Sequence, residues 1–311
     1  MTSDQALWAI AAMLVAVLIG AAQIYQEETK NTIGWLLGRQ SILIGDARRM
    51  ISGGIWTVRE RLGQRRTYKV GCFNYSPLSK STHSESGEES YEGPWPQLTR
   101  AIAQKLDIDI QISSISATGF EYPRKITHDI VVGLFRTAWR EKYFHFSDPV
   151  HRIRLQGICR RDRPRITKEE LIDANLGVVV QPGEVGWEYV RDEVLSAKPK
   201  HKVKYAPLSD THEIMSLLLS GDWDVAVSDE LSCLQFLEKA DYAERYQIAF
   251  DWALPSYSAC VAVRKGVASI DMNKLNRALR EARNDPGFRE LERRCLGDKY
   301  GGAVEKLSLS A

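Results

Sequence analysis

Residues 129–149 constrain the fold of this chain more than any other stretch of its sequence. The stretch opens with a short apolar run, Ile130–Val132, which ends at Gly133 and leads into a polar loop with Thr137 and Arg140. A short apolar run of this kind is typical of a buried strand. An arginine in the following loop is well suited to bind a carboxylate, because its planar guanidinium offers parallel donors. We therefore expect a buried strand that presents an anion-binding side chain.

The same stretch resembles the signature of the family 3 bacterial extracellular solute-binding proteins, which serve amino-acid ABC transporters. The family pattern is roughly G-x-T-x-T-x-x-R-x-x-x-x-x-F-S-x-P. The positions that match without gaps are Gly133, Thr137, Arg140, Phe146, Ser147 and Pro149, and Phe135 stands where the family has a threonine. The resemblance implies that Arg140 grips the carboxylate of a ligand.

Other segments resemble the family in the same order along the chain, from Tyr68 to Gly297. The matching segments are Asn74–Leu78, Gly93–Leu106, Asn175–Gly186, Gly221–Asp229 and Ser256–Gly266. Strands and helices alternate through this region, which is typical of an α/β fold. The resemblance implies the two-lobed periplasmic-binding-protein type 2 fold, with lobe 1 at 67–157 plus 254–299 and lobe 2 at 158–253. Residues 300–311 are then a tail.

The resemblance also implies a set of ligand-binding residues in the interlobe cleft. Asp229 would meet the amino group of the ligand, and its structural alternative is a helix N-cap. The structural alternative for Arg140 is a salt bridge with Glu141 or Asp148. The full expected set is Arg140, Asp229, Thr137, Tyr75, Phe120, Phe135, Gly183, Glu184 and Val185. For Tyr75 and Phe120, ordinary core packing is the alternative.

Besides Phe135, three residues depart from the family near this expected site. Glu184 and Val185 stand where threonines are usual, so hydroxyl contacts are lost and a negative charge is added. Trp95 stands where the family often has an aspartate. These departures weaken the prediction of an ordinary amino-acid ligand.

The N-terminal region differs from the rest of the chain. Leu7–Tyr25 carries no charge and has about the ~20 residues needed to cross a bilayer as a helix. We expect an uncleaved anchor rather than a signal peptide, because residues 1–5 contain no Lys or Arg. Residues 32–64 form a basic connector, either an amphipathic segment on anionic lipid or a packed stalk. Residues 1–66 thus comprise anchor and connector.

The side of the membrane is set by two opposing arguments. Basic residues follow the span, which by the positive-inside rule favours a cytoplasmic domain. The family resemblance implies the periplasm, and only Lys30 and Arg39 lie close enough to the span to count. We expect a periplasmic soluble domain, with the cytoplasmic orientation left open.

Composition argues against several other functions. A net charge of +2 gives no electrostatic argument for nucleic acid. The five cysteines are widely spaced and odd in number, which favours buried thiols over a disulfide framework. The six histidines show no metal-ligand spacing, and no cofactor is expected. The sequence has no G-x-x-x-x-G-K-[ST] motif, so an ABC permease or a sensor partner would have to supply any ATPase or kinase activity.

Three functions remain. The leading one is a membrane-anchored solute-binding protein for an amino acid or a similar small carboxylate. The second is a dehydratase-like enzyme on the same fold, for which Glu184 would supply the acid. The third is a degenerate lobe pair that binds no ligand and acts as a scaffold or sensor module; the departures at Phe135, Glu184 and Val185 favour it.

Overall fold

The computed structural model describes residues 66–83, 89–115, 125–173, 176–197, 202–205, 217–218, 220–267 and 270–305. The expected anchor, the connector and Phe120 lie outside these residues. Within the described part of the chain, no helix has both the length and the apolar character needed to cross a membrane.

The first half of the main sheet combines strands from the beginning of the described chain with one strand from near its end. β1 (Thr67–Cys72) pairs in parallel with β4 (Asp109–Ser114) and β5 (Ile130–Phe135), and β11 (Ser256–Arg264) pairs antiparallel to β5. Every residue of β5 is buried, as the apolar run predicts for a central strand.

Three helices pack in this half: α3 (Pro94–Leu106), α10 (Met272–Asn284) and α11 (Pro286–Gly301). α3 buries Leu98, Ile102 and Ala103, which recur at helical spacing, so the predicted helix over 93–106 and its buried face are confirmed. α10 and α11 follow β11 in the chain.

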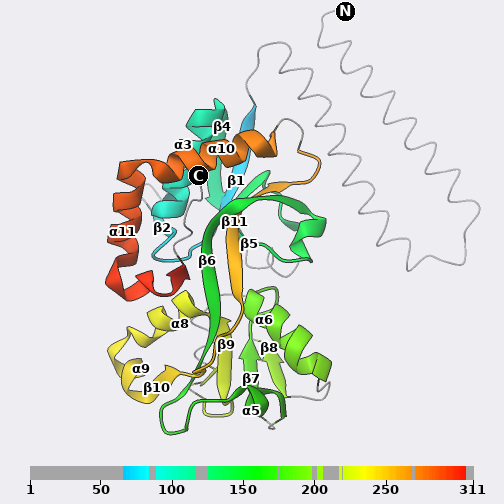
Figure 1. Cartoon of the computed structure of the whole chain (residues 1–311), viewed down its shortest axis with the longest axis vertical. Coiled ribbons are helices and arrows are strands. Elements are labelled where there is room, and N and C mark those ends of the chain that lie inside the picture. The colour runs from blue at the N-terminus through cyan, green and yellow to red at the C-terminus, as the bar shows by residue number, and fades with distance from the viewer. Residues whose placement is uncertain are drawn as a thin grey trace, which may run out of the picture. The chain divides into compact units, whose positions relative to one another are not determined.

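The long strand β6 (Phe144–Arg160) belongs to both halves of the sheet (Figure 1). Its first part pairs with β11, and its last residues pair with β9 (Val225–Asp229) and β10 (Tyr246–Ile248). The short strand β12 (Val304–Glu305) pairs with its middle at Arg152 and Ile153. The Phe146–Pro149 segment therefore lies inside a strand, although its serine, aspartate and proline are typical of a loop.

The second half of the sheet continues from β9 through β7 (Val178–Val180) to β8 (Val203–Tyr205). Its helices are α5 (Lys168–Asp173), α6 (Val185–Tyr189), the π-helical η3 (Val190–Leu195), α8 (Glu230–Leu237) and α9 (Ala240–Arg245). A core of Ile158, Val179, Ala226, Cys233 and Phe236, all almost fully buried, joins β6, β7, β9 and α8. The described residues within 67–265 and 270–305 form one compact unit, and the lobe boundaries at 157/158 and 253/254 stay a prediction.

The Ser/Glu/Gly-rich composition of residues 83–93 predicts a solvated loop, and this prediction is wrong in part. Glu89–Glu92 form strand β3, which pairs antiparallel with β2 (Lys80–His83). Tyr91 in β3 is buried, and Arg100 donates to its backbone carbonyl. The polar composition of this segment masked a hairpin whose single aromatic residue packs inward.

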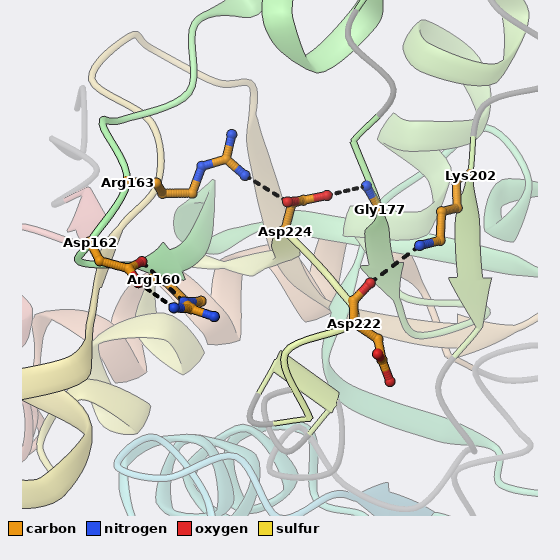
Figure 2. A network of polar contacts seen from close by, with 7 residues as sticks. All are labelled: Arg160, Asp162, Arg163, Gly177, Lys202, Asp222 and Asp224. Atoms are coloured by element: carbon orange, nitrogen blue, oxygen red, sulfur yellow. Dashed lines mark hydrogen bonds and ion pairs between the residues drawn. The ribbon is translucent and has the colours of Figure 1, made fainter.

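The basic run at 160–165 is held by pairing within the chain (Figure 2). Arg160 pairs with Asp162, and Arg163 lies 3.0 Å from Asp224. Asp224 also accepts a hydrogen bond of 2.6 Å from the backbone N–H of Gly177, which ties the crossing loop to the start of β7. Arg160 and Arg163 of the run therefore have acidic partners within the chain.

The five cysteines are free thiols. Cys72, Cys159, Cys233 and Cys260 are buried, which confirms the prediction of buried thiols for these four, and Cys295 is partly exposed. Burial raises the pKa of Cys72 and of Cys260 to about 12, so neither thiol ionises readily near neutral pH.

Candidate functional site

Arg140 lies where the two halves of the sheet meet. It begins the short helix η2 (Arg140–Lys142), just after β5, and only 1% of its surface is exposed. Its guanidinium donates a hydrogen bond of 2.9 Å to the carbonyl of Phe135 and one of 2.6 Å to the carbonyl of Gly183. Gly183 follows β7, so Arg140 links β5 in the first half to the turn after β7 in the second.

The salt bridges considered as alternatives for Arg140 are formed by other arginines. Glu141 pairs with Arg136 at 2.6 Å, and Asp148 pairs with Arg280 at 2.7 Å. The carboxyl groups that act on the buried Arg140 guanidinium are those of Glu184 and Glu188. Burial lowers the pKa of Arg140, and these two carboxyls oppose that change.

Glu188 is a residue of the site that the sequence analysis missed. It is buried in α6, and its Oε1 accepts a hydrogen bond of 3.0 Å from the hydroxyl of Thr137. Thr137 also accepts the backbone N–H of Arg140 at 3.3 Å. A signal was present, because Glu184 and Glu188 are four residues apart and such residues share one helix face.

The turn at Gly183–Val185 leads from β7 into α6. Gly183 has a φ of +80°, Glu184 is the residue before the helix, and Val185 is buried as its first residue. Gly186 packs so closely on β9 that a Cβ there would lie 2.6 Å from the carbonyl oxygen of Val227. This close packing holds the start of α6 against β9.

Glu184 experiences several charges at once. Burial raises its pKa to about 7; Arg140 opposes that change, whereas Asp229 and Glu188 reinforce it. Burial also raises the pKa of Glu188, again opposed by Arg140. Glu184 therefore lies within electrostatic reach of both residues that the sequence predicts to hold the ligand.

Of the two roles that the sequence leaves open for Asp229, the structure shows the helix N-cap. It ends β9 and caps α8, where its Oδ1 accepts the backbone N–H of Ser232 at 2.9 Å and its Oδ2 accepts the Ser232 hydroxyl at 2.7 Å. The N-cap alternative is thus confirmed. The Tyr75 hydroxyl donates a further bond of 2.6 Å to Oδ1, and burial together with Asp229 raises the pKa of Tyr75 well above its usual value.

Aromatic rings surround Tyr75. The Trp95 ring stacks on it, with centroids 5.1 Å apart and planes at 3°, and Phe135 meets it edge-on at 6.4 Å. Trp95 fits only because residue 133 is glycine: a Cβ there would lie 2.1 Å from the indole ring. The departure at Trp95 is therefore matched by the glycine of the signature.

A buried chain of polar contacts runs from Trp95 away from Tyr75. The indole N–H donates to His151 Nδ1 at 2.9 Å, and His151 Nε2 lies 2.6 Å from Glu292 on α11. An indole N–H can only donate, so Nδ1 accepts and, in the neutral ring, Nε2 donates to Glu292. No sequence signal connects these three residues.

The structure thus brings eight of the nine expected residues to one junction, and Phe120 lies outside the described residues. A further contact across the junction joins the Gln235 side chain to the carbonyl of Ser76. Whether these residues bind a ligand stays a prediction. In the described part of the chain, no group of three or more His, Cys, Asp or Glu side chains could hold a metal ion.

Two cavities lie away from this junction. One of about 460 Å³ is lined by residues that include Arg160, Arg245 and Tyr246, and one of about 1080 Å³ lies between α3, α10 and α11. Neither is lined by an expected ligand-binding residue.

No protein-family model matches the chain, and no curated protein matches it. Solved structures match about three quarters of it. The AvGluR1 ligand-binding domain in complex with phenylalanine superposes with a TM-score of 0.63 at 14% identity, covering 75% of this chain and 96% of that one. The substrate-binding protein of an amino acid ABC transporter gives 0.56 at 20% identity, covering 74% and 99%.

A histidine kinase sensor domain with similarity to periplasmic binding proteins gives a TM-score of 0.59 at 18% identity, covering 76% of this chain and 98% of the domain. At these identities the likeness establishes the fold. The described chain has the mixed α/β fold of the periplasmic solute-binding proteins, which confirms the fold expected from the resemblance.

Proposed function

We propose that this chain is a membrane-anchored receptor for an amino acid or a similar small carboxylate, which it binds between the two halves of its sheet. Arg140 pairs with the carboxylate of the ligand and Asp229 with its ammonium group. A zwitterion bound in this way contacts both halves, so binding favours the closed arrangement. The proposal is supported by the similarity in fold to the AvGluR1 ligand-binding domain, to the substrate-binding protein of an amino acid ABC transporter and to the histidine kinase sensor domain.

One observation carries the proposal. Arg140 and Asp229 come from segments far apart in the sequence, yet Glu184 interacts with both of them. Each is also bonded across the junction, Arg140 to Gly183 and Asp229 to Tyr75. A donor for a carboxylate and an acceptor for an ammonium therefore both act on Glu184, which supports a site for a zwitterionic ligand.

The test is a thermal unfolding screen of the full chain against amino acids, dicarboxylates and prephenate-like cyclic acids. A ligand that binds the folded chain selectively raises its midpoint by mass action. We expect a shift with amino acids that is lost in Arg140→Ala and in Asp229→Ala. Arg152→Ala is the matched control, because Arg152 is exposed on β6 and should leave the shift unchanged.

A specific observation favours a second candidate, a scaffold that binds no ligand. The Arg140 guanidinium donates hydrogen bonds to the backbone carbonyls of Phe135 and Gly183, so it is already hydrogen-bonded without a ligand. A flat screen with every compound would support the scaffold. A shift with the cyclic acid alone would instead support the dehydratase, with Glu184 as its acid.

The cellular setting forms the rest of the proposal. We propose that residues 7–25 anchor the chain, that the described domain faces the periplasm, and that an ABC permease or a sensor receives its signal. The uncharged span in the sequence supports the anchor, and the family resemblance supports the orientation.

A further inference from the structure

The candidate site carries more negative than positive charge. The groups that act on Glu184 are the guanidinium of Arg140 and the carboxyls of Asp229 and Glu188. Counting Glu184 itself, three carboxyls share one guanidinium among the described residues of the junction. Above about pH 7 Glu184 is ionised, and a zwitterion, which has no net charge, would then pair with Arg140 and Asp229 and leave this excess uncompensated.

The other neighbours of these carboxyls do not remove the excess. The Thr137 hydroxyl bonded to Glu188 is neutral. Arg191 also acts on Glu188, but it forms its own pair with Asp192 at 2.7 Å. Tyr75 bonds Asp229 as a neutral phenol, because burial and the nearby carboxyls keep its proton in place.

Glu184 is placed to meet a ligand. It is only partly buried, whereas Asp229 and Glu188 are both more than nine-tenths buried. It lies in the turn before α6, where its side chain forms no cap bond to the helix. It also acts electrostatically on Tyr75, so it is close to the aromatic rings as well as to Arg140.

From these observations we propose that the ligand carries a net positive charge, as a basic amino acid does with a second ammonium or a guanidinium group, and that Glu184 selects it. The inference rests on the proposed receptor function and specifies its ligand class. The extra cation of the ligand pairs with Glu184, and the partly exposed ring of Tyr75 offers a face on which a cation is also favoured. The family pattern has threonine at the position of Glu184, and a threonine would give no preference for a positively charged ligand.

The test compares L-arginine with L-citrulline, its uncharged analogue of nearly the same shape, by calorimetric titration of the full chain at pH 8. We expect arginine to bind at least about tenfold more tightly than citrulline, because one hydrogen bond to a charged group ordinarily contributes about that much to affinity. Glu184→Gln should reduce this ratio to about one while citrulline affinity is kept or raised, because the change removes a like charge near the ligand carboxylate.

Two variants serve as controls. Glu184→Asp keeps the carboxylate and should retain a preference for arginine. Glu193→Gln removes an exposed carboxylate from η3, the helix that follows α6, and should leave the ratio of the two affinities unchanged. Unfolding midpoints of all variants show whether each one is folded.

The outcomes separate the two proposals. Equal affinity for arginine and citrulline in the unmodified chain would overturn the charge preference and leave the receptor function standing. A preference that survives in Glu184→Gln would overturn the assignment to Glu184. No binding of any amino acid in the earlier screen would overturn the receptor function itself, and the charge preference with it.

Discussion

The hydroxyl group of Tyr75 donates a hydrogen bond of 2.6 Å to Oδ1 of Asp229, a residue 154 positions further along the chain. The bond joins the turn after β1 to the N-terminus of α8. It occupies the same carboxylate that the proposed receptor offers to a ligand ammonium, so ligand binding and the contact between the two halves share one acceptor.

Removal of this bond should weaken the fold measurably. Tyr75→Phe leaves Asp229 with its two bonds from Ser232 but removes a buried donor, and we expect a loss of about 1–3 kcal/mol in the free energy of unfolding, since the acceptor is charged. Urea unfolding measures it. Tyr143→Phe is the control, because no partner of its hydroxyl is found among the described residues, and an equal loss in both variants would contradict the role of the bond.

The stability of the chain should depend on pH through Glu184. Its pKa of about 7 lies above the usual 4.5, so between these values the folded chain holds a proton that the unfolded chain has released. The resulting stabilisation is complete below about pH 4.5 and is lost as the pH rises through about 7. Glu184→Gln should therefore gain stability relative to the unmodified chain as the pH is raised from 5 to 8.

Urea unfolding of the two chains at each pH measures this effect. Glu193→Gln, which changes an exposed glutamate, should run parallel to the unmodified chain over the same range. If the Glu184→Gln curve also ran parallel, the raised pKa would be refuted.

Trp95 should stabilise the first half through its bond to His151. Trp95→Phe keeps an aromatic ring beside Tyr75 but leaves the buried Nδ1 of His151 without its donor, at a cost of about 1–3 kcal/mol. Denaturant unfolding provides the value. Trp139→Phe is the matched control because Trp139 is exposed, and a cost no greater than that of the control would show that the indole N–H is dispensable.

The proposed periplasmic orientation leads to a test in living cells. We expect alkaline phosphatase fused after Ala311 to be active, because it folds to its active form only after export, and β-galactosidase fused at the same point to be inactive. The opposite pair of activities would place the domain in the cytoplasm, as the basic residues after the span would favour.

Much of the fold could be predicted from the sequence, because its signals are local. The apolar run at Ile130–Val132 and the spacing of Leu98, Ile102 and Ala103 fix a buried strand and a one-sided helix without knowledge of the rest of the chain. The length of β6 could not be predicted, since Ser147 and Asp148 carry no strand signal. Their place in the strand depends on pairing with β11, far away in sequence.

The sequence predicts those residues of the candidate site whose type and immediate neighbours form a recognisable motif. The motifs predict Arg140 and Asp229 as site residues, and the N-cap role of Asp229 follows from the helix after it. Glu188 was missed although its spacing from Glu184 gave a signal. The bond from Trp95 to His151 depends on tertiary packing alone, and no local pattern could have indicated it.

The fit between Gly133 and Trp95 limits the order in which these two positions can change during evolution. A side chain at residue 133 would overlap the indole and would also require a φ near +74°, which residues other than glycine rarely adopt. A lineage that carries this tryptophan therefore cannot replace the glycine first. The ring must shrink before position 133 can accept a side chain.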